Sequence, residues 1–482
     1  SSLVGMGHLI RTLALIEPLK ALGTVWFATE TVNDAFVERV KGAGCQVIPL
    51  GHDCTPEEEV RTILETTGDK PIHTVITDHY ELDAQWHKAI RPHTTTIIAV
   101  DDLANRPFDC DYILDPNLGA TAARYDSLVP AHCQRLCGPA YALLRPEFVG
   151  LRKKATVRKT LRRILISFGG GDIDNLTEWA VKLLLTHYPE LELRVVIGPH
   201  HEGKKRLMNV AQSGLPIQLF ENLNAQEMGQ LMLEADLAIG GGGQTSWERC
   251  ALALPTILIL VADNQKNNTD ALVRAGAALM LGKHTKENPL NNHLMRTLDG
   301  LIQNPEALAV LSKRAQPLID GLGPQRVAVR LQPATIRLAL LEDARPLWEW
   351  ANDPITRKNA LNSEDIPWES HLEWLPQVLG DPERYLMVGE WLGTPFGSCR
   401  FDGSSEGATV TIALAPSHRR LGLSVPLLRQ ATRMYWDEAG PRPIIAYIRP
   451  HNIASLRLFV ACDFEPIESD TANTHKFVLL PG

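Results

Sequence analysis

Short apolar runs alternate with helical segments through the first two thirds of the chain. The runs are continuous rather than alternating in polarity, which indicates strands buried on both faces and hence parallel sheets made of βα repeats. Before the basic stretch at 152–163, the runs are 25–27, 47–49, 75–77, 97–100 and 112–114. After it, they are 164–168, 193–197, 237–239 and 257–260. We therefore predict two doubly wound, Rossmann-like halves, with a ligand cleft at the carboxyl ends of their strands.

The pattern changes after a linker at Gln332-Pro333. A strand at 336–338 and a Trp-rich amphipathic helix at 342–351 come first. The later elements are strands at 385–388, 395–401, 408–413 and 444–447, with a helix at 422–439 before the last of them. This order predicts an α+β domain with an antiparallel meander. The 482 residues thus divide into three domains, 1–150, 151–331 and 335–482, as the length suggests.

Composition narrows the class of protein. The net charge of −8 argues against nonspecific binding to nucleic acid or to an anionic membrane surface. The eight cysteines form no CxxC pair and are typical of free thiols in a cytoplasmic protein. The longest apolar run, 250–262, contains Pro255 and is shorter than the ~20 residues that span a bilayer. No signal peptide is recognisable. The chain starts in a loop-like segment at Ser1, and we therefore expect a further strand before that residue.

Four consecutive glycines, 240–243, connect an apolar run to a helical pattern. Glycine permits a sharp turn and close approach to a ligand, and the following helix would direct free N–H groups at an anion such as a diphosphate. Glu248, one turn into that helix, is placed to accept hydrogen bonds from ribose hydroxyls. The alternative is a glycine-rich loop before a capped helix, without a ligand.

The N-terminal pattern predicts a loop over residues 1–7 and a helix that starts at His8. The helix dipole there disfavours the imidazolium form, so His8 is a candidate general base for water. Asp78 and Tyr80 follow one predicted strand and Asp101-Asp102 follows the next, which places these groups at one edge of the sheet. Helix and turn capping is the alternative for each of them.

Six motifs occur together in one order, and the set resembles the UDP-sugar hydrolases of pseudaminic acid biosynthesis, the PseG family. They are Gly5-x-Gly7-His8-x-x-Arg11, Asp78-His79-Tyr80, Asp101-Asp102-Leu103-Ala104, Gly138-x-x-Tyr141-x-Leu143-Leu144-Arg145, Ser167-Phe168-Gly169-Gly170 and Gly243-x-Thr245-Ser246-x-Glu248. The resemblance covers residues 1–331 and implies a fold like that of GT-B glycosyltransferases. It implies that His8 activates water at the anomeric carbon of UDP-2,4-diacetamido-2,4,6-trideoxy-β-L-altropyranose, with inversion.

The same resemblance implies a set of site residues. Asp78 and Tyr80 join His8 as catalytic residues. The residues expected to bind the UDP-sugar are Gly5, Gly7, Arg11, Gly169, Gly243, Thr245, Ser246, Glu248, Asn264 and Gln265. We expect no metal, because helix N-termini can supply the positive field.

The C-terminal region carries a second anion-binding pattern. Arg419-Arg420-Leu421-Gly422-Leu423-Ser424 lies between a strand and a helix and is suited to a pyrophosphate, with a basic surface turn as the alternative. With Asn452-x-x-Ser455-x-x-x-Phe459 downstream, residues 335–480 resemble GNAT acetyltransferases. Trp350-x-Asn352-Asp353 and His371-x-x-Trp374 resemble the branch acting on UDP-4-amino sugars, the PseH type.

The GNAT resemblance implies acetyl-CoA as co-substrate. The residues expected to bind it are Ile412, Leu414, Arg419, Arg420, Gly422, Ser424, Asn452 and Phe459. A tyrosine that protonates the coenzyme A thiolate usually stands where this chain has Phe459. Water or Tyr447 would replace it, and we expect slower acetyl transfer.

Together these patterns predict a bacterial, cytoplasmic, bifunctional enzyme. Its GNAT domain would acetylate the 4-amino group of a UDP-sugar, and its first two domains would then hydrolyse the bond to UDP. One alternative keeps the fold but makes the chain a GT-B glycosyltransferase. Another makes it a hydrolase with a non-catalytic domain that senses acetyl-CoA, or a UDP-sugar sensor.

Overall fold

The computed structural model describes residues 5–30, 34–68, 70–169, 172, 174–198, 201–285, 289–469 and 473–481. Contacts divide the chain into two compact units, Ser1–Val327 and Ala328–Gly482. The boundary falls inside helix α13 (Gly323–Leu331), so the predicted linker at Gln332-Pro333 directly follows a helix. Among the described residues, no helix has both the length and the apolar character needed to cross a bilayer.

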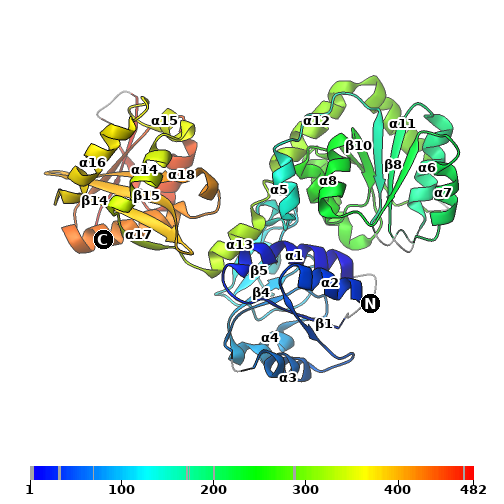
Figure 1. The fold of residues 1–482 in the computed structure, drawn as a ribbon, viewed down its shortest axis with the longest axis horizontal. Helices are drawn as coiled ribbons and strands as arrows, with labels where there is room; N and C mark the ends of the chain where they lie inside the picture. Colours follow the sequence, from blue (N-terminus) through cyan, green and yellow to red (C-terminus); the bar gives the residue numbers. More distant parts are fainter. Residues whose placement is uncertain are drawn as a thin grey trace. The chain divides into compact units, whose positions relative to one another are not determined.

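The first lobe of unit 1 contains two parallel sheets (Figure 1). One pairs β1 (Trp26–Thr29) with β2 (Gln46–Pro49). The other has four strands in sequence order, β3 (Ile72–Thr77), β4 (Thr94–Val100), β5 (Tyr112–Asp115) and β6 (Gln134–Cys137). Its helices are α1 (Gly5–Lys20), α2 (Asp34–Gly42), α3 (Pro56–Thr67) and α4 (Ala84–Ile90). No strand pair joins the two sheets within the described residues, whereas the sequence suggested one sheet.

Helix α1 begins at Gly5, three residues before the predicted start at His8. Glycine has low helix propensity, but tertiary packing can override it. Leu9 and Ile16 on α1 pack in one cluster with Val40 and Cys45. This packing fixes α1 from Leu9 onward, and the helix extends back to Gly5, so the predicted loop over residues 1–7 is wrong for residues 5–7. The strand expected ahead of Ser1 lies outside the described residues.

The second lobe of unit 1 is a six-stranded parallel sheet in the order β12-β11-β10-β7-β8-β9. The strands are β7 (Arg163–Ser167), β8 (Glu192–Ile197), β9 (Ile217–Glu221), β10 (Leu237–Gly240), β11 (Thr256–Ile259) and β12 (Ala278–Gly282). Along β7, Ile164 and Ile166 enter one hydrophobic cluster and Leu165 the other. The strand is therefore buried on both faces, as its continuous apolarity predicted.

Helices cover both faces of this sheet (Figure 1). Helices α6 (Leu176–His187), α7 (Lys204–Ala211), α11 (Asn291–Gln303) and α12 (Pro305–Ala315) contribute to one cluster. Helices α5 (Pro146–Arg152), α8 (Ala225–Glu234), α9 (Thr245–Ala251) and α10 (Lys266–Arg274) contribute to the other. This is the doubly wound arrangement, in which the loops after the strands can form a ligand site.

Unit 2 has a mixed seven-stranded sheet in the order β13-β14-β15-β16-β17-β19-β18. The strands are β13 (Thr335–Leu338), β14 (Arg384–Trp391), β15 (Thr394–Ser404), β16 (Gly407–Leu414), β17 (Ile444–Ile448), β18 (Glu465–Ile467) and β19 (His475–Leu479). Its helices are α14 (Ala344–Ala351), α15 (Pro354–Asn359), α16 (Trp368–Gly380), α17 (Ser424–Ala439) and α18 (Ile453–Ala461). The antiparallel meander β14–β16 was predicted, whereas α15, α16, α18, β18 and β19 were not.

Candidate active sites

His8 lies in the first turn of α1 beside the end of β3. Its Nδ1 is 2.6 Å from Oδ1 of Asp78, the residue that follows β3. A carboxylate only accepts hydrogen bonds, so Nδ1 carries the proton in this pair. In the neutral ring this leaves Nε2 as the acceptor, which is the atom a general base needs. The Tyr80 ring packs edge-on against the imidazole, 4.9 Å between centroids.

Arg11, one turn after His8, holds Asp78 and Asp102 together. Its Nε donates to Asp78 Oδ2 at 2.7 Å and its Nη1 to Asp102 Oδ2 at 3.1 Å. Burial alone would raise the pKa of Asp78, but the charge and hydrogen bonds of Arg11, with the hydrogen bond from His8, hold that pKa well below its usual range. Asp78 is therefore an anion that orients His8. Arg11, expected at the UDP-sugar, acts in this structure on the two carboxylates.

Tyr80 connects this group to the second lobe of unit 1. Its hydroxyl donates to Asp102 Oδ2 at 3.3 Å and accepts from Asn264 Nδ2 at 3.3 Å. Burial raises the pKa of Tyr80, so the hydroxyl keeps its proton at neutral pH. Thus the structure brings together five residues that the sequence placed in the site, His8, Arg11, Asp78, Tyr80 and Asn264.

A buried network supports the Asp101-Asp102 loop. Asp101 Oδ2 accepts from the amides of Leu103 and Ala104, at 3.1 and 2.7 Å. The Tyr125 hydroxyl lies 3.0 Å from Oδ2 of Asp101 and 3.0 Å from Oδ2 of Asp115. A hydroxyl has one proton and can donate to only one of the two carboxylates. Arg124 offsets part of the burial of Asp115, because its Nη1 donates to Asp115 Oδ2 at 2.7 Å. Burial raises the pKa of Asp115 to about 6.

We therefore expect Asp115 to make stability depend on pH. Because its pKa is raised on folding, its contribution is fully present below about pH 4 and is lost as pH rises to about 6, a change of about 3 kcal/mol. Urea unfolding at pH 4.5 and pH 7 should show a smaller pH difference for Asp115→Asn than for the wild type. Asp126→Asn, at an exposed carboxylate, is the control. An unchanged pH difference in Asp115→Asn would contradict the assignment.

The glycine loop follows β10 and leads into α9. A Cβ on Gly240 would lie 2.2 Å from the Ser167 carbonyl oxygen, and one on Gly242 would lie 2.1 Å from Thr269 Oγ1. Packing behind the loop therefore requires glycine at both positions, in addition to the ligand approach considered from the sequence. The Gly242 amide donates to Gln265 Oε1 at 3.0 Å. This bond fixes the loop against the segment that contains Asn264.

Three successive amides of this loop are available for an anion. The amides of residues 243–245 have no hydrogen-bond partner among the described residues. Successive unpaired amides form a concave site that binds anions. Gly243 and Thr245 thus offer unpaired amides, whereas the Ser246 side chain is buried, and their role in binding UDP stays a prediction. Gly169, which follows β7 with a φ of +84°, has open space around its Cα.

Glu248 is 3% exposed and pairs with Arg145. Both Nε and Nη2 of Arg145 lie 2.8 Å from Glu248 Oε1. Burial raises the pKa of Glu248, although the Arg145 charge and hydrogen bond oppose that rise. Arg145 precedes α5, 103 residues before Glu248, and was not a candidate site residue from sequence. A ribose at this carboxylate would therefore meet a group already oriented by an arginine.

In unit 2, strands β16 and β17 diverge. They are paired only at Ala408–Ile444 and Thr409–Ile445. The rest of β16 therefore has no strand pairing on the edge that faces β17. Ile412 and Leu414 lie on this unpaired part of β16. The backbone edge there can hydrogen-bond an extended ligand, as an open sheet edge does in peptide recognition.

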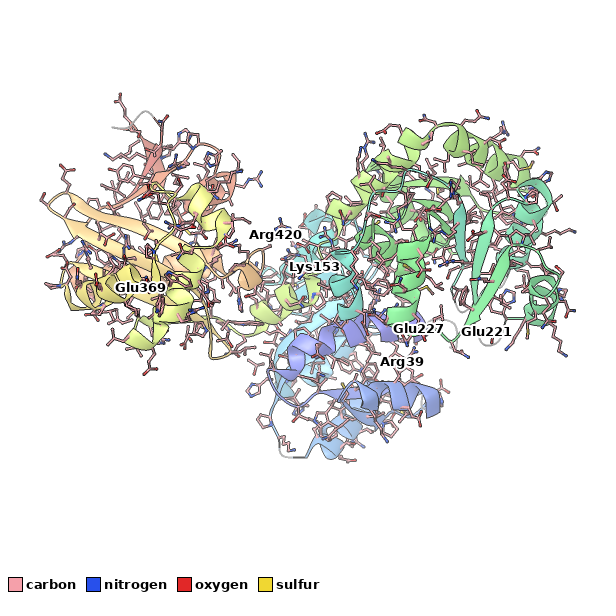
Figure 2. All side chains as sticks on the ribbon, turned by 45° about the horizontal axis from the view of Figure 1, so that its top comes forward. Arg39, Lys153, Glu221, Glu227, Glu369 and Arg420 are labelled. Carbon is pink, nitrogen blue, oxygen red and sulfur yellow. The ribbon has the colours of Figure 1, made fainter. Side chains whose placement is uncertain are left out.

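The loop before α17 lies at the end of this open edge. Gly422 has a φ of +86° and open space where a side chain would be. Arg420 (labelled in Figure 2) precedes it with a φ of +66°, and Ser424 starts the 16-residue α17. Arg419 is turned to α15, with Nη2 donating to Asp353 Oδ2 at 2.6 Å. A loop that leads into a helix in this way is suited to an anion, and the pyrophosphate site stays a prediction from the sequence pattern.

Two further predicted residues have local structural roles. Asn452 caps α18, with its Oδ1 accepting from the Ser455 amide at 3.2 Å. Phe459 is 4% exposed and packs edge-on against Phe464, 4.9 Å between ring centroids. Tyr447, the alternative proton donor, lies on β17 with the Lys476 Nζ 5.8 Å from its ring centroid.

The described residues include no group of three or more His, Cys, Asp or Glu side chains suited to a metal ion.

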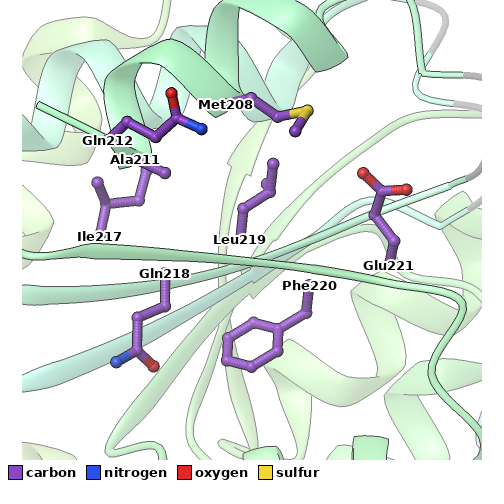
Figure 3. A pocket seen from close by; sticks show the side chains of 8 residues that line it. All are labelled: Met208, Ala211, Gln212, Ile217, Gln218, Leu219, Phe220 and Glu221. Atoms are coloured by element: carbon purple, nitrogen blue, oxygen red, sulfur yellow. The ribbon is translucent and has the colours of Figure 1, made fainter.

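A shallow hollow between α7 and β9 is separate from these sites (Figure 3). Its lining residues are Met208, Ala211, Gln212, Ile217, Gln218, Leu219, Phe220 and Glu221. Leu219 and Glu221 point to the side of Met208, whereas Gln218 and Phe220 point to the opposite side of the strand, as side chains alternate along β-strands. None of the residues predicted from sequence lines this hollow.

Both units contain known domain types. Residues 167–320 match the glycosyltransferase family 28 C-terminal domain, and residues 334–465 match the acetyltransferase (GNAT) domain. The predicted fold class, two GT-B-like lobes followed by an α+β GNAT domain, is confirmed.

Two named relatives narrow the type of protein that the first unit resembles. The chain is 26% identical over 337 residues to the spore coat polysaccharide biosynthesis protein SpsG of Bacillus subtilis, covering 68% of this chain and 94% of that protein. It is 26% identical over 277 residues to the UDP-2,4-diacetamido-2,4,6-trideoxy-β-L-altropyranose hydrolase of Campylobacter jejuni, covering 57% of this chain and 94% of that enzyme. The predicted combination of a PseG-type hydrolase homologue with a GNAT domain is confirmed.

Proposed function

We propose that the chain is a bifunctional enzyme acting on a UDP-linked amino sugar. The GNAT domain transfers an acetyl group from acetyl-CoA to the 4-amino group, and unit 1 then hydrolyses the bond between the sugar and UDP. The observation that carries the hydrolase assignment is the 2.6 Å contact between His8 Nδ1 and Asp78 Oδ1. The similarity to the Campylobacter jejuni hydrolase supports UDP-2,4-diacetamido-2,4,6-trideoxy-β-L-altropyranose as the substrate.

In the hydrolytic step, Nε2 of His8 accepts a proton from water while the water oxygen attacks the anomeric carbon. The bond from that carbon to the diphosphate oxygen breaks, and the electron pair leaves with UDP. Asp78 stabilises the imidazolium that forms, because it remains an anion. The unpaired amides of residues 243–245 are suited to the charge that develops on the departing diphosphate. Attack opposite the leaving group inverts the anomeric centre.

In the acetylation step, the neutral 4-amine attacks the thioester carbon of acetyl-CoA. The C–S bond breaks, the thiolate leaves, and the ammonium loses its proton to solvent. The loop 420–424 binds the pyrophosphate, and the unpaired part of β16 aligns the pantetheine arm. Positioning of the two reactants supplies a large part of the acceleration.

The eight free cysteines favour a cytoplasmic location, where no disulfides are needed.

Release of UDP from the diacetamido sugar, followed by ³¹P NMR, tests the hydrolase assignment against its alternative. We expect UDP and free sugar to form with water as the only acceptor. A glycosyltransferase would release UDP stoichiometrically only after an acceptor is added. A sensor would bind the UDP-sugar without releasing UDP.

We expect Glu248→Gln to weaken UDP binding by about 1.5–3 kcal/mol, the range for hydrogen bonds to a charged group. Glutamine keeps the side-chain length and one acceptor for Arg145, so the variant removes charge with little change of shape. Isothermal titration with UDP measures the effect, and Glu227→Gln, in the exposed N-terminal turn of α8, is the control. UDP affinity equal to that of the wild type would exclude Glu248 from the site.

A further inference from the structure

A buried cation lies beneath the glycine loop. Arg249 is 3% exposed, and its guanidinium donates from Nη2 to the Gly241 carbonyl and from Nε to the Thr245 carbonyl, the latter at 3.3 Å. Its Nη2 also lies 3.4 Å from Ser246 Oγ. No carboxylate of the described residues lies within ion-pair distance of it. The neighbouring carboxylate, Glu248, is paired with Arg145 instead.

This guanidinium is charged at neutral pH. Burial lowers the pKa of Arg249 to about 10, which still leaves it protonated at pH 7. A buried charge is screened less by solvent and salt than a surface charge, so it acts strongly on groups within a few ångströms. Burying a cation without a carboxylate is costly, and only backbone carbonyls and a hydroxyl offset that cost here.

The groups of the glycine loop and the side chain that packs against Gly242 are suited to an anion. The amides of residues 243–245 have no partner among the described residues. Thr269, which is fully buried against Gly242, also has a hydroxyl without a hydrogen-bond partner. Helix α9 has seven residues, so its dipole adds little to the field at the loop. Arg249 is the one basic residue on α9.

We propose that Arg249 supplies the positive charge that binds the diphosphate of a nucleotide at the amides of residues 243–245. It does so without touching the ligand, through its field and by holding the Gly241 carbonyl on the far side of the loop. Arg249 is thus a positioning residue of the diphosphate site. The inference rests on the proposed function, because it assigns a role within the same nucleotide site.

Arg158 offers a matched control at the other end of α9. It is also buried, and burial also lowers its pKa to about 10. Its guanidinium donates to carbonyls at the ends of α8 and α9, including Met232 at 3.0 Å and Leu252 at 2.7 Å. Helix carboxyl ends favour a cation, so Arg158 stabilises the fold but has no contact with the glycine loop.

The test compares UDP with uridine, which has the same base and ribose but no charge. Isothermal titration of the full chain measures both affinities for the wild type, Arg249→Met, Arg249→Lys and Arg158→Met. We expect Arg249→Met to weaken UDP binding at least about 10-fold with uridine affinity unchanged, because a unit charge in the protein interior still acts on an anion several ångströms away. Arg249→Lys should recover most of the UDP affinity. Arg158→Met should lower Tm without changing the ratio of the two affinities.

Equal losses for UDP and uridine, or no loss for UDP, in a folded Arg249→Met would overturn the inference. If that variant does not fold, Arg249→Gln gives the same comparison, because glutamine keeps a donor for the Gly241 carbonyl but lacks the charge. A wild type that hydrolyses the UDP-sugar while Arg249 variants bind UDP normally refutes only this inference. A wild type without UDP affinity refutes the proposed function itself.

Discussion

His8→Asn should lower the kcat of UDP-sugar hydrolysis by about 10²–10⁴-fold, the usual contribution of a positioned general base. Asparagine can still donate to Asp78 from about the position of Nδ1, but it has no basic nitrogen at the position of Nε2. UDP affinity should be unchanged, because the amides proposed to bind the diphosphate lie on the second lobe. Steady-state hydrolysis with UDP titration in parallel measures the two effects.

His79→Asn is the matched control for this variant. His79 lies between Asp78 and Tyr80, but its side chain is exposed and accepts only the Glu81 amide of its own turn, at 3.2 Å. We expect its kcat to stay within a few-fold of the wild type. Turnover in His8→Asn close to that of His79→Asn would remove His8 as the base.

Gly422→Glu should reduce acetyl transfer below detection. Gly422 has a φ of +86°, which a residue with a Cβ adopts only at a cost of about 1–2 kcal/mol. The added carboxylate would also project into the space proposed for the pyrophosphate, where like charges repel. Acetylation of a UDP-4-amino sugar, followed by mass spectrometry, measures the loss. Hydrolysis of the already acetylated UDP-diacetamido sugar by unit 1 in the same protein should continue.

Gly440→Glu separates the two causes. Gly440 has a φ of +80°, open space around its Cα, and a position at the other end of α17. It therefore carries the same backbone strain and the same new charge without reaching the pyrophosphate loop. We expect Gly440→Glu to acetylate nearly as fast as the wild type. Equal activity in the two variants would contradict the position of the pyrophosphate.

The fold was predictable where burial leaves a strong pattern. Strands β4 and β7 lie inside their sheets and contain buried apolar runs, Ile97–Val100 and Ile164–Ile166, so their sequences reveal them. Strand β6 reads Gln-Arg-Leu-Cys and β9 reads Ile-Gln-Leu-Phe-Glu, and both lie at the edge of a sheet. Edge strands bury fewer side chains, and their composition does not distinguish them from loops.

The site was predictable only in part, because sequence places residues on elements but does not pair them. Asp78 was expected near His8 since it follows a strand, but the charge of Arg11 that keeps Asp78 ionised depends on a contact across 67 residues. The pairing of Arg145 with Glu248 spans 103 residues. Whether a group such as Arg249 has a carboxylate partner is likewise decided by packing, which no local pattern encodes.

The order of the two reactions is the central claim, and one NMR experiment tests it directly. Proton spectra are recorded on the purified chain with a UDP-linked sugar that carries a free 4-amine, with and without acetyl-CoA. With acetyl-CoA, we predict a new acetamido methyl signal on the sugar, followed by UDP and a free reducing sugar. Without acetyl-CoA, the UDP-sugar should persist. Rapid hydrolysis of the unacetylated sugar, or binding of acetyl-CoA with no acetylated sugar after overnight incubation, would contradict the account.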